Sequence, residues 1–283
     1  MLKLIECPRD AMQGWHRIIS TEEKVEYLNA LLKVGFDTID FGSFVSPKAI
    51  PQMADTAKVL PQLDLSGSKS KLLAIVANVR GAEEAVIFDE INYLGFPFSV
   101  SETFQLRNTN KTIAESLEQV QTIQELCIKN KKELVVYISM GFGNPYGDAY
   151  SPEIVLRWVE EMVKMEITTI SLADTVGVAD PVTINNLFNH LIPAYPQVEF
   201  GAHFHAAPNN WQEKVLAAWE HGCRRFDSAL KGIGGCPMAK DELVGNLATE
   251  NLIAFCEQHQ APLQLDPSAL HKAQALADIV FKN

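Results

Sequence analysis

Residues 201–205 contain the clearest candidate for chemistry, two histidines separated by one residue. If this segment ends a β-strand, the alternation of side chains places His203 and His205 on one face and Phe204 on the other. Two imidazoles on one face can bind one cation together, although a pair of ordinary histidines explains the spacing equally well. A metal site would need a third ligand from another part of the chain.

Asp10 is the best candidate for that third ligand, because it follows the first predicted strand in the sequence Pro8-Arg9-Asp10. Taken alone, an Asp at such a point is more often a turn former or a helix cap. Arg9 is either a solvated surface charge or a clamp for a developing oxyanion. Asn246 could add an amide oxygen, although alone it would more often be a cap. One carboxylate, two imidazoles and an amide suit Mg²⁺ or Mn²⁺ better than zinc.

Cys236 lies in a glycine-rich segment, residues 231–237, after the last predicted strand. Three glycines allow the backbone to move and to approach a ligand closely, so a catalytic thiol is reasonable. An incidental cysteine in a flexible or phosphate-binding turn is equally consistent. The five cysteines include no C-x-x-C pair, which argues against a disulfide framework and a cysteine zinc site, and most are expected to be buried, reduced thiols.

Two further carboxylates, Asp40 and Asp174, also fall where predicted strands end. Either could cap a helix, or both could orient ligands or accept a proton. Glu6 and Gln13 are weaker candidates.

The elements that must position these residues alternate along the whole chain as short β-rich runs and longer stretches of helical periodicity. Helix starts are expected at Ser20, Ser151 and Asp180, where a side chain able to cap precedes a proline or early acids. Single helices are predicted over 51–60 and 113–129. The eight predicted strands span 2–6, 38–41, 71–77, 91–100, 133–140, 168–172, 198–203 and 224–227.

Eight βα units without a linker-like stretch favour one (β/α)₈ TIM barrel over a doubly wound sheet, which usually has fewer strands. We expect one domain over 1–283, with the barrel in about 1–260 and a C-terminal helical addition in about 266–283. Active sites in this fold collect at the C-terminal ends of the strands. The helical addition could cover the barrel or a partner subunit, which leaves a homodimer or larger homo-oligomer open.

The composition excludes several classes of function. The chain has 283 residues, 47% of them hydrophobic and 21% charged, as in ordinary globular proteins. Its formal charge of −11 opposes nonspecific binding to nucleic acid or acidic lipid. No segment reaches the roughly 18 apolar residues of a membrane span, and the N-terminus lacks a signal-peptide core. We therefore expect a cytoplasmic protein with small-molecule partners and no nucleic-acid or membrane partner.

The chain resembles the metal-dependent carbon–carbon lyases and Claisen-type synthases built on a TIM barrel, and most closely the 3-hydroxy-3-methylglutaryl-CoA lyase family. The Ser-Phe-Val-Ser-Pro-Lys run and the glycine–cysteine loop are the segments that separate the lyases from the synthases. The resemblance is carried by Pro8-Arg9-Asp10 with Gln13, by 42–48 with 51–53, by Ser101-Glu102, by 171–177, by His203 and His205, by 234–237 and by 245–250.

The resemblance implies a role for each candidate. Arg9 would stabilise a developing enolate and bind substrate, and Cys236 would join the proton transfer. Asp174 would support catalysis, and Asp40 stands where the family has a glutamate, so its catalytic role transfers only in part. Gln13 and Glu250 would help to bind substrate. The metal shell, for Mg²⁺ or Mn²⁺, would consist of Asp10, His203, which is also catalytic, His205 and Asn246.

The function implied is cleavage of 3-hydroxy-3-methylglutaryl-CoA, or a close 3-hydroxyacyl-CoA, to acetyl-CoA and acetoacetate or another keto acid. The chain departs from the family after the second histidine, where Ala206 stands in place of Asp or Asn and Trp211 could narrow the pocket. A related aldolase or Claisen-type acyltransferase acting on another hydroxy or keto acid is therefore an alternative. A noncatalytic metal-binding barrel is a third reading, against which Arg9 and Cys236 argue.

Overall fold

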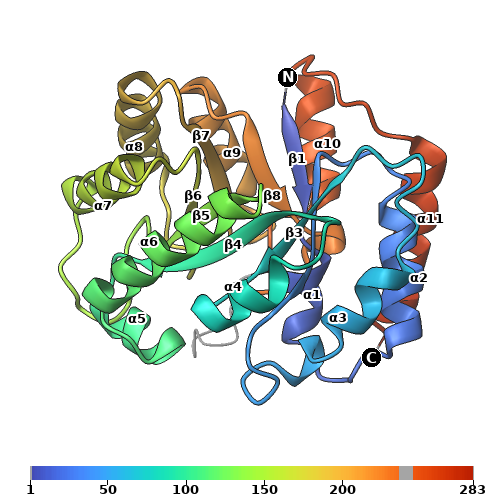
Figure 1. Ribbon diagram of the computed structural model, residues 1–283. Helices are drawn as coiled ribbons and strands as arrows, with labels where there is room; N and C mark the ends of the chain where they lie inside the picture. Colours follow the sequence, from blue (N-terminus) through green and yellow to red (C-terminus); the bar gives the residue numbers. More distant parts are fainter. Residues whose placement is uncertain (1, 236–244, 283) are drawn as a thin grey trace.

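Eight parallel strands form a closed barrel in which each strand pairs with its neighbours in sequence and β8 pairs with β1. This computed structural model describes residues 2–235 and 245–282, so Cys236 lies outside the described residues. The predicted (β/α)₈ barrel is confirmed (Figure 1). The strands are β1 (Lys3–Glu6), β2 (Thr38–Ser43), β3 (Lys71–Ile75), β4 (Ile91–Ser99), β5 (Glu133–Ser139), β6 (Thr169–Asp174), β7 (Glu199–Phe204) and β8 (Arg225–Ser228).

Helices surround the barrel, as Figure 1 shows. The longer ones are α2 (Thr21–Leu31), α6 (Ile113–Lys129), α7 (Pro152–Lys164), α8 (Pro181–Ala194), α9 (Trp211–Glu220), α10 (Thr249–Gln258) and α11 (Pro267–Val280). Shorter elements are α1 (Pro8–Gln13), α3 (Thr56–Val59), α4 (Val79–Ala85), α5 (Glu102–Thr109) and the 3₁₀ turns η1 (Pro51–Met53), η2 (Leu60–Gln62) and η3 (Leu230–Gly232).

The single helix predicted over 51–60 is wrong, because the structure divides this stretch into η1, α3 and η2. The Thr56 hydroxyl donates to the Met53 carbonyl at 2.9 Å, a local bond that competes with helix continuation. At the other end, Pro61 has no N–H to extend an α-helix. The local bond and the proline together account for the interruption.

Two of the three predicted helix starts have the expected cap. Ser20 and Glu23 form a capping box at α2, and the Asp180 carboxylate accepts from Val182 N and Thr183 N at α8. The hydroxyl cap predicted at Ser151 is wrong, because its side chain bonds to the Glu153 carboxyl group instead of an N–H of α7.

Two short helices that the sequence did not predict lie at the C-terminal ends of the barrel strands. Pro8 starts α1 directly after β1, so Arg9 and Asp10 project from a helical turn rather than from the end of a strand. After β4, the Ser101 hydroxyl accepts from Phe104 N and starts α5. Both helices line the site described below.

The C-terminal helix α11 lies beside α2 on the outside of the barrel (Figure 1). Its Ala273, Ala277 and Val280 are buried, whereas Ile279 is 61% exposed. In the part of the chain that the structure describes, no helix is long and apolar enough to cross a membrane. The cysteines within the described ranges are buried free thiols, as predicted.

Candidate active site

A cavity of about 550 Å³ opens at the C-terminal ends of the strands, where the barrel prediction placed the site. Apolar side chains, among them Val45, Ile50 and Phe104, form one part of its wall. Six of the candidate residues line the cavity: Arg9, Asp10, Gln13, Asp40, His203 and His205.

The three charged or imidazole candidates for a metal shell converge although they come from opposite ends of the chain. Asp10, His203 and His205 each offer one ligand atom, and these atoms all lie within 4.8 Å of one another. The two imidazole rings have centroids 5.3 Å apart. The structure thus brings the H-x-H pair at the end of β7 next to the carboxylate of Asp10 in α1, as the sequence predicted.

Each imidazole is oriented through its Nδ1 atom. His203 Nδ1 lies 3.1 Å from Asp227 Oδ2, and His205 Nδ1 lies 3.0 Å from the Thr175 carbonyl oxygen. Donation from Nδ1 leaves the Nε2 lone pair free in each ring. His205 Nε2 is buried and has no hydrogen-bond partner among residues 2–235 and 245–282. A buried, orphaned ring nitrogen beside a carboxylate and a second imidazole fits a divalent metal ion.

The electrostatics favour the ligand forms of His205 and Asp10, whereas His203 is shifted toward its protonated form. Burial, assisted by the neighbouring His203, lowers the pKa of His205 to about 4, so this ring is neutral near pH 7. Burial disfavours a charge on His203, but the hydrogen bond and charge of Asp227 outweigh it and raise its pKa. Burial also works against a charged Asp10, yet Arg9 and the two imidazoles lower its pKa below the usual range. Asp10 is therefore a carboxylate.

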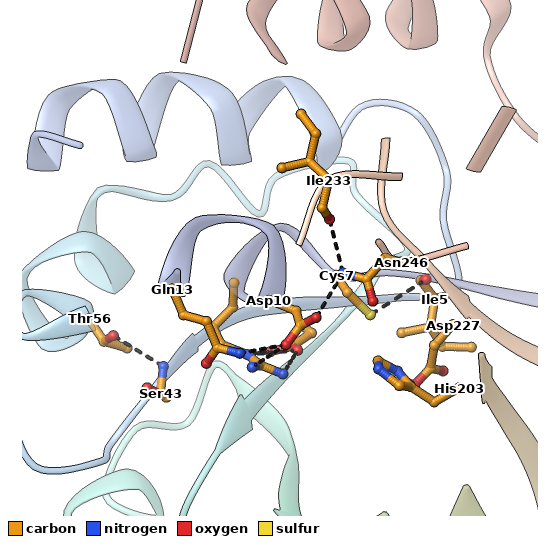
Figure 2. Close-up of polar contacts among 12 residues, drawn as sticks. Ile5, Cys7, Asp10, Gln13, Ser43, Thr56, His203, Asp227, Ile233 and Asn246 are labelled. Carbon is orange, nitrogen blue, oxygen red and sulfur yellow. Dashed lines mark hydrogen bonds and ion pairs between the residues drawn. The ribbon is translucent and has the colours of Figure 1, made fainter. Parts of the chain in front are cut away.

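A second cluster shares His203 with this group. Cys7, His203 and Asp227 also offer atoms within 4.8 Å of one another. Figure 2 shows Asp227 beside His203, on the side away from Gln13. Burial raises the pKa of the Cys7 thiol well above its usual value, so the sulfur keeps its proton and is a poor ligand.

Asn246 reaches the same place from the segment before α10. Its Nδ2 donates to Asp10 Oδ2 at 2.7 Å and to the Ile233 carbonyl at 2.9 Å (Figure 2). Rotation of the amide would exchange its oxygen and nitrogen, which presents an oxygen ligand to an ion held by Asp10. Gly234, with φ of +116°, packs so closely that a Cβ there would clash with this amide.

Arg9 is held rigidly at the edge of the cavity. Its Nε and Nη2 donate to Asp40 Oδ2 at 3.0 and 2.5 Å, and its Nη1 donates to Asp10 Oδ1 at 2.9 Å. Gln13 Nε2 donates to the same Asp10 oxygen at 2.7 Å. Burial raises the pKa of Asp40 to about 6 although Arg9 opposes the shift. Asp40 is thus a group whose charge can change near neutral pH.

Asp174 and Glu250, like Asn246, lie outside the cavity lining. Asp174 is buried against Lys214 at 2.7 Å, and its other oxygen accepts from Ala179 N at 3.0 Å. Glu250 accepts from Lys231 N at 2.9 Å and from Gln274 at 3.2 Å. Both carboxylates already form hydrogen bonds or ion pairs with other residues of the protein. This geometry favours a role in positioning neighbouring residues over direct contact with a substrate.

Trp211 also lies away from the cavity lining. It is the first residue of α9 and packs, partly buried, against the hydrophobic core. The expectation that its ring narrows the pocket is therefore wrong.

Sequence reasoning missed two sets of residues at the site. Asp227, the partner of His203, ends the eighth predicted strand, so the rule that selected Asp40 and Asp174 could have found it. Arg107 and Lys111 line the mouth of the cavity from α5 and the residues just after it, and α5 itself was not predicted.

The loop after β5 contacts α5, which carries Arg107 at the mouth of the cavity. Asp148 accepts from the Ser101 hydroxyl at 2.5 Å and from Thr103 N at 2.9 Å, which ties this loop to the start of α5. The Arg107 guanidinium lies 4.6 Å from the centre of the Tyr146 ring. These contacts hold a positive group at the cavity entrance.

A family model described as HMGL-like matches residues 3–277, nearly the whole chain. The chain belongs to the HMGL-like family. Its relatives include the hydroxymethylglutaryl-CoA lyase of Bacillus subtilis, 33% identical over 251 residues, which cover 89% of this chain and 83% of that protein. The (R)-citramalyl-CoA lyase of Chloroflexus aurantiacus is 32% identical over 272 residues, covering 93% of this chain and 85% of that one.

Solved structures of the HMGL-like family share the fold. An HMG-CoA lyase from Acinetobacter baumannii, in complex with coenzyme A and 3-methylmalate, has a TM-score of 0.91 and 33% identity, with 99% of this chain and 91% of that chain covered. The HMG-CoA lyase from Brucella melitensis has a TM-score of 0.92 at 26% identity, with 100% and 99% covered. The protein is thus an enzyme of a carbon–carbon lyase family.

Proposed function

We propose that the protein is a divalent-metal-dependent lyase that cleaves 3-hydroxy-3-methylglutaryl-CoA, or a close 3-hydroxyacyl-CoA, to acetyl-CoA and acetoacetate or another keto acid. The observation that carries this proposal is the orphaned His205 Nε2, which faces the same space as Asp10 and His203 beside the immobilised Arg9 guanidinium. A ligand set and an oxyanion clamp in one cavity suit a reaction that generates an enolate.

Asp10, His203 and His205 would hold the ion, with Asn246 as a fourth ligand. These oxygen and nitrogen donors suit Mg²⁺ or Mn²⁺. When bound, such an ion supplies polarisation of substrate oxygens and lowers the pKa of the tertiary hydroxyl group.

The side chains around this position account for the remaining steps. The hydroxyl proton leaves to a base, the C–C bond breaks, and its electron pair passes to the thioester fragment as an enolate. Asp40, with a pKa of about 6, is the candidate base that lines the cavity, and Arg9 stabilises the enolate oxygen. A proton donor must then complete acetyl-CoA, and Cys236 is the proposed donor.

The other predicted residues support these groups in different ways. Gln13 lines the cavity and can contact substrate while it holds Asp10. Glu250 would act indirectly, because its carboxylate binds Lys231 N at the start of the segment that leads to Cys236. Asp174 would act through Lys214.

The cavity mouth supports an acyl-CoA as the substrate. Arg107 and Lys111 place two positive charges where an extended thioester would leave the cavity, and coenzyme A carries phosphates. The apolar wall formed by Val45, Ile50 and Phe104 can contact the uncharged part of such a ligand. Citramalyl-CoA is a second candidate substrate, because a relative with that activity in its name is as similar as the HMG-CoA lyases.

The test measures acetyl-CoA release by metal-stripped protein with and without added Mg²⁺ or Mn²⁺. The substrates are 3-hydroxy-3-methylglutaryl-CoA, citramalyl-CoA and a hydroxy acid without coenzyme A. Metal-dependent release that is lost in His203→Ala supports the proposal. Absence of release from protein that binds the ion would reject these substrates.

A companion variant separates the lyase from a noncatalytic metal-binding barrel. Cys236→Ser should lose turnover and keep its affinity for Mn²⁺, because the thiol is proposed as a proton donor and not as a ligand. Unchanged turnover would remove Cys236 from the mechanism.

A further inference from the structure

Lys214 is a fully buried cation at the C-terminal ends of the strands, and the proposed chemistry gives it no role beyond its contact with Asp174. It lies in α9, and its side chain is 1% exposed. Its Nζ donates to Asp174 Oδ2 at 2.7 Å, to the Gly177 carbonyl at 3.0 Å and to the His205 carbonyl at 3.0 Å. These three bonds use all three donors of the ammonium group.

The first two contacts close the turn that follows β6. Asp174 Oδ1 accepts from Ala179 N at 3.0 Å, while Lys214 joins Asp174 Oδ2 to the Gly177 carbonyl. The turn from 174 to 179 is therefore wrapped around one ammonium group. Without that cation, a buried carboxylate and a partly buried carbonyl would each lose a partner.

This turn carries the group that orients His205. The Thr175 carbonyl accepts from His205 Nδ1 at 3.0 Å, and the Thr175 hydroxyl oxygen accepts from Met140 N at 2.9 Å. Lys214 in addition holds the backbone carbonyl of His205 itself. One cation thus restrains the histidine at two points, its main chain and the acceptor of its ring.

Fold stability alone is a weak explanation for such a pair. Removing a lysine and an aspartate from water is costly for each ion, and apolar residues of similar volume often stabilise a fold as well or better. The three oxygen atoms bound by Lys214 all belong to the ends of β6 and β7 and the residues that follow. This placement indicates a role at the site.

We propose that Lys214, paired with Asp174, is a positioning residue that holds His205 Nε2 toward Asp10 and His203 and thereby sets the affinity and geometry of the metal site. The inference rests on the proposed function in one respect, namely that a divalent ion binds there. It assigns Asp174 to the same positioning unit.

The first experiment compares Lys214→Met with Lys24→Met. Lys24 is a matched control, because it is 3% exposed, pairs with Asp55 at 2.6 Å and donates to the Gln52 carbonyl, but contacts none of the metal ligands. Mn²⁺ affinity is measured by calorimetry, and the Co²⁺-substituted proteins are compared by visible absorption. Lys214→Met should weaken Mn²⁺ binding about 10–100-fold, as expected for a residue that orients a ligand, and change the Co²⁺ spectrum. Lys24→Met should leave both unchanged.

A double variant separates positioning from folding. Lys214→Met leaves Asp174 buried without its partner and can destabilise the fold, whereas Lys214→Met with Asp174→Leu removes both charges and should recover stability. The double variant should nevertheless keep the weakened Mn²⁺ affinity and the altered Co²⁺ spectrum. Wild-type affinity and spectrum in either variant would overturn the inference.

These outcomes are distinct from failure of the proposed function. If the unsubstituted protein binds Mn²⁺ but releases no acetyl-CoA, the substrate assignment fails while the role of Lys214 is still decided by the metal measurements. If the unsubstituted protein binds neither Mn²⁺ nor Co²⁺, the metal site itself and this inference are both rejected.

Discussion

The contact between His203 and Asp227 yields the sharpest prediction about the metal site. His203 Nδ1 lies 3.1 Å from Asp227 Oδ2, and the Asp227 side chain is completely buried. Its other oxygen, Oδ1, has no partner in the described ranges 2–235 and 245–282. The perturbation is Asp227→Asn, which keeps the shape of the side chain but removes its charge and allows the amide to turn an N–H toward the ring.

The expected loss follows from the kind of bond removed. A hydrogen bond to a charged group contributes about 1.5–3 kcal/mol, and water cannot replace it at this buried position. Loss of a residue that orients a metal ligand typically weakens metal binding about 10–100-fold, which corresponds to about 1.4–2.7 kcal/mol. The two estimates agree, so Asp227→Asn should raise the Mn²⁺ dissociation constant by one to two orders of magnitude.

The assay is calorimetric titration of metal-stripped protein with Mn²⁺ at fixed pH. Asp55→Asn, at the partner of Lys24 outside the cavity lining, is the control and should bind Mn²⁺ as the wild type does. Urea unfolding reports any general damage to the fold. A dissociation constant within twofold of the wild type would refute the reasoning that Asp227 orients His203 as a ligand.

Three further predictions concern other parts of the molecule. Burial raises the pKa of Glu6 to about 8, so the stability contributed by its protonated form is complete below about pH 4.5 and is lost as the pH rises through 8. Glu6→Gln stays neutral at every pH, so its free energy of unfolding relative to the wild type should increase by ~1.4 kcal/mol for each pH unit between these two values. Urea unfolding at pH 5.5 and pH 8 measures this difference, and an equal difference at the two pH values would contradict the prediction. The double variant Arg107→Ala, Lys111→Ala should raise KM several-fold for the acyl-CoA and leave kcat unchanged, whereas KM for the matching pantetheine thioester should not change. Equal effects on both thioesters would exclude contact of these two side chains with the nucleotide phosphates. Ser20→Ala removes the cap of α2 and should lower the free energy of unfolding by ~1 kcal/mol at unchanged kcat, measured by urea unfolding and steady-state assay, whereas a change in kcat would show that the α2 cap affects the site.

The barrel and much of its site were predictable because the relevant signals are local. Runs of β-branched and apolar residues predict the strands. The two-residue period of a strand is enough to predict that His203 and His205 lie on one face. Asp10 could be chosen because a barrel brings the ends of its first and seventh strands to one mouth. The structure confirms that these three side chains converge.

Other residues escaped prediction because their roles depend on distant partners. The sequence pattern predicts Lys214 only as a polar position of an amphipathic helix. In the structure its ammonium group contacts Asp174 and the His205 carbonyl, because α9 packs against the segments that carry them. Arg107 gains its place at the mouth through the contact with Tyr146, which lies in a loop about forty residues later. No local pattern encodes such contacts.

The sequence by itself determined the order and type of the strands, the spacing of the histidines and the identity of the groups able to bind a cation, because these depend on near neighbours in the chain. Only the tertiary structure decided what each polar group does. Closure of the barrel buried Asp40 and raised its pKa, and it left His205 Nε2 without a partner in the described part of the chain. Barrel closure also pairs Asp174 with Lys214, so Asp174 does not line the cavity. Burial and long-range pairing set the free energy of a charge, and both arise only when segments far apart in sequence are packed together.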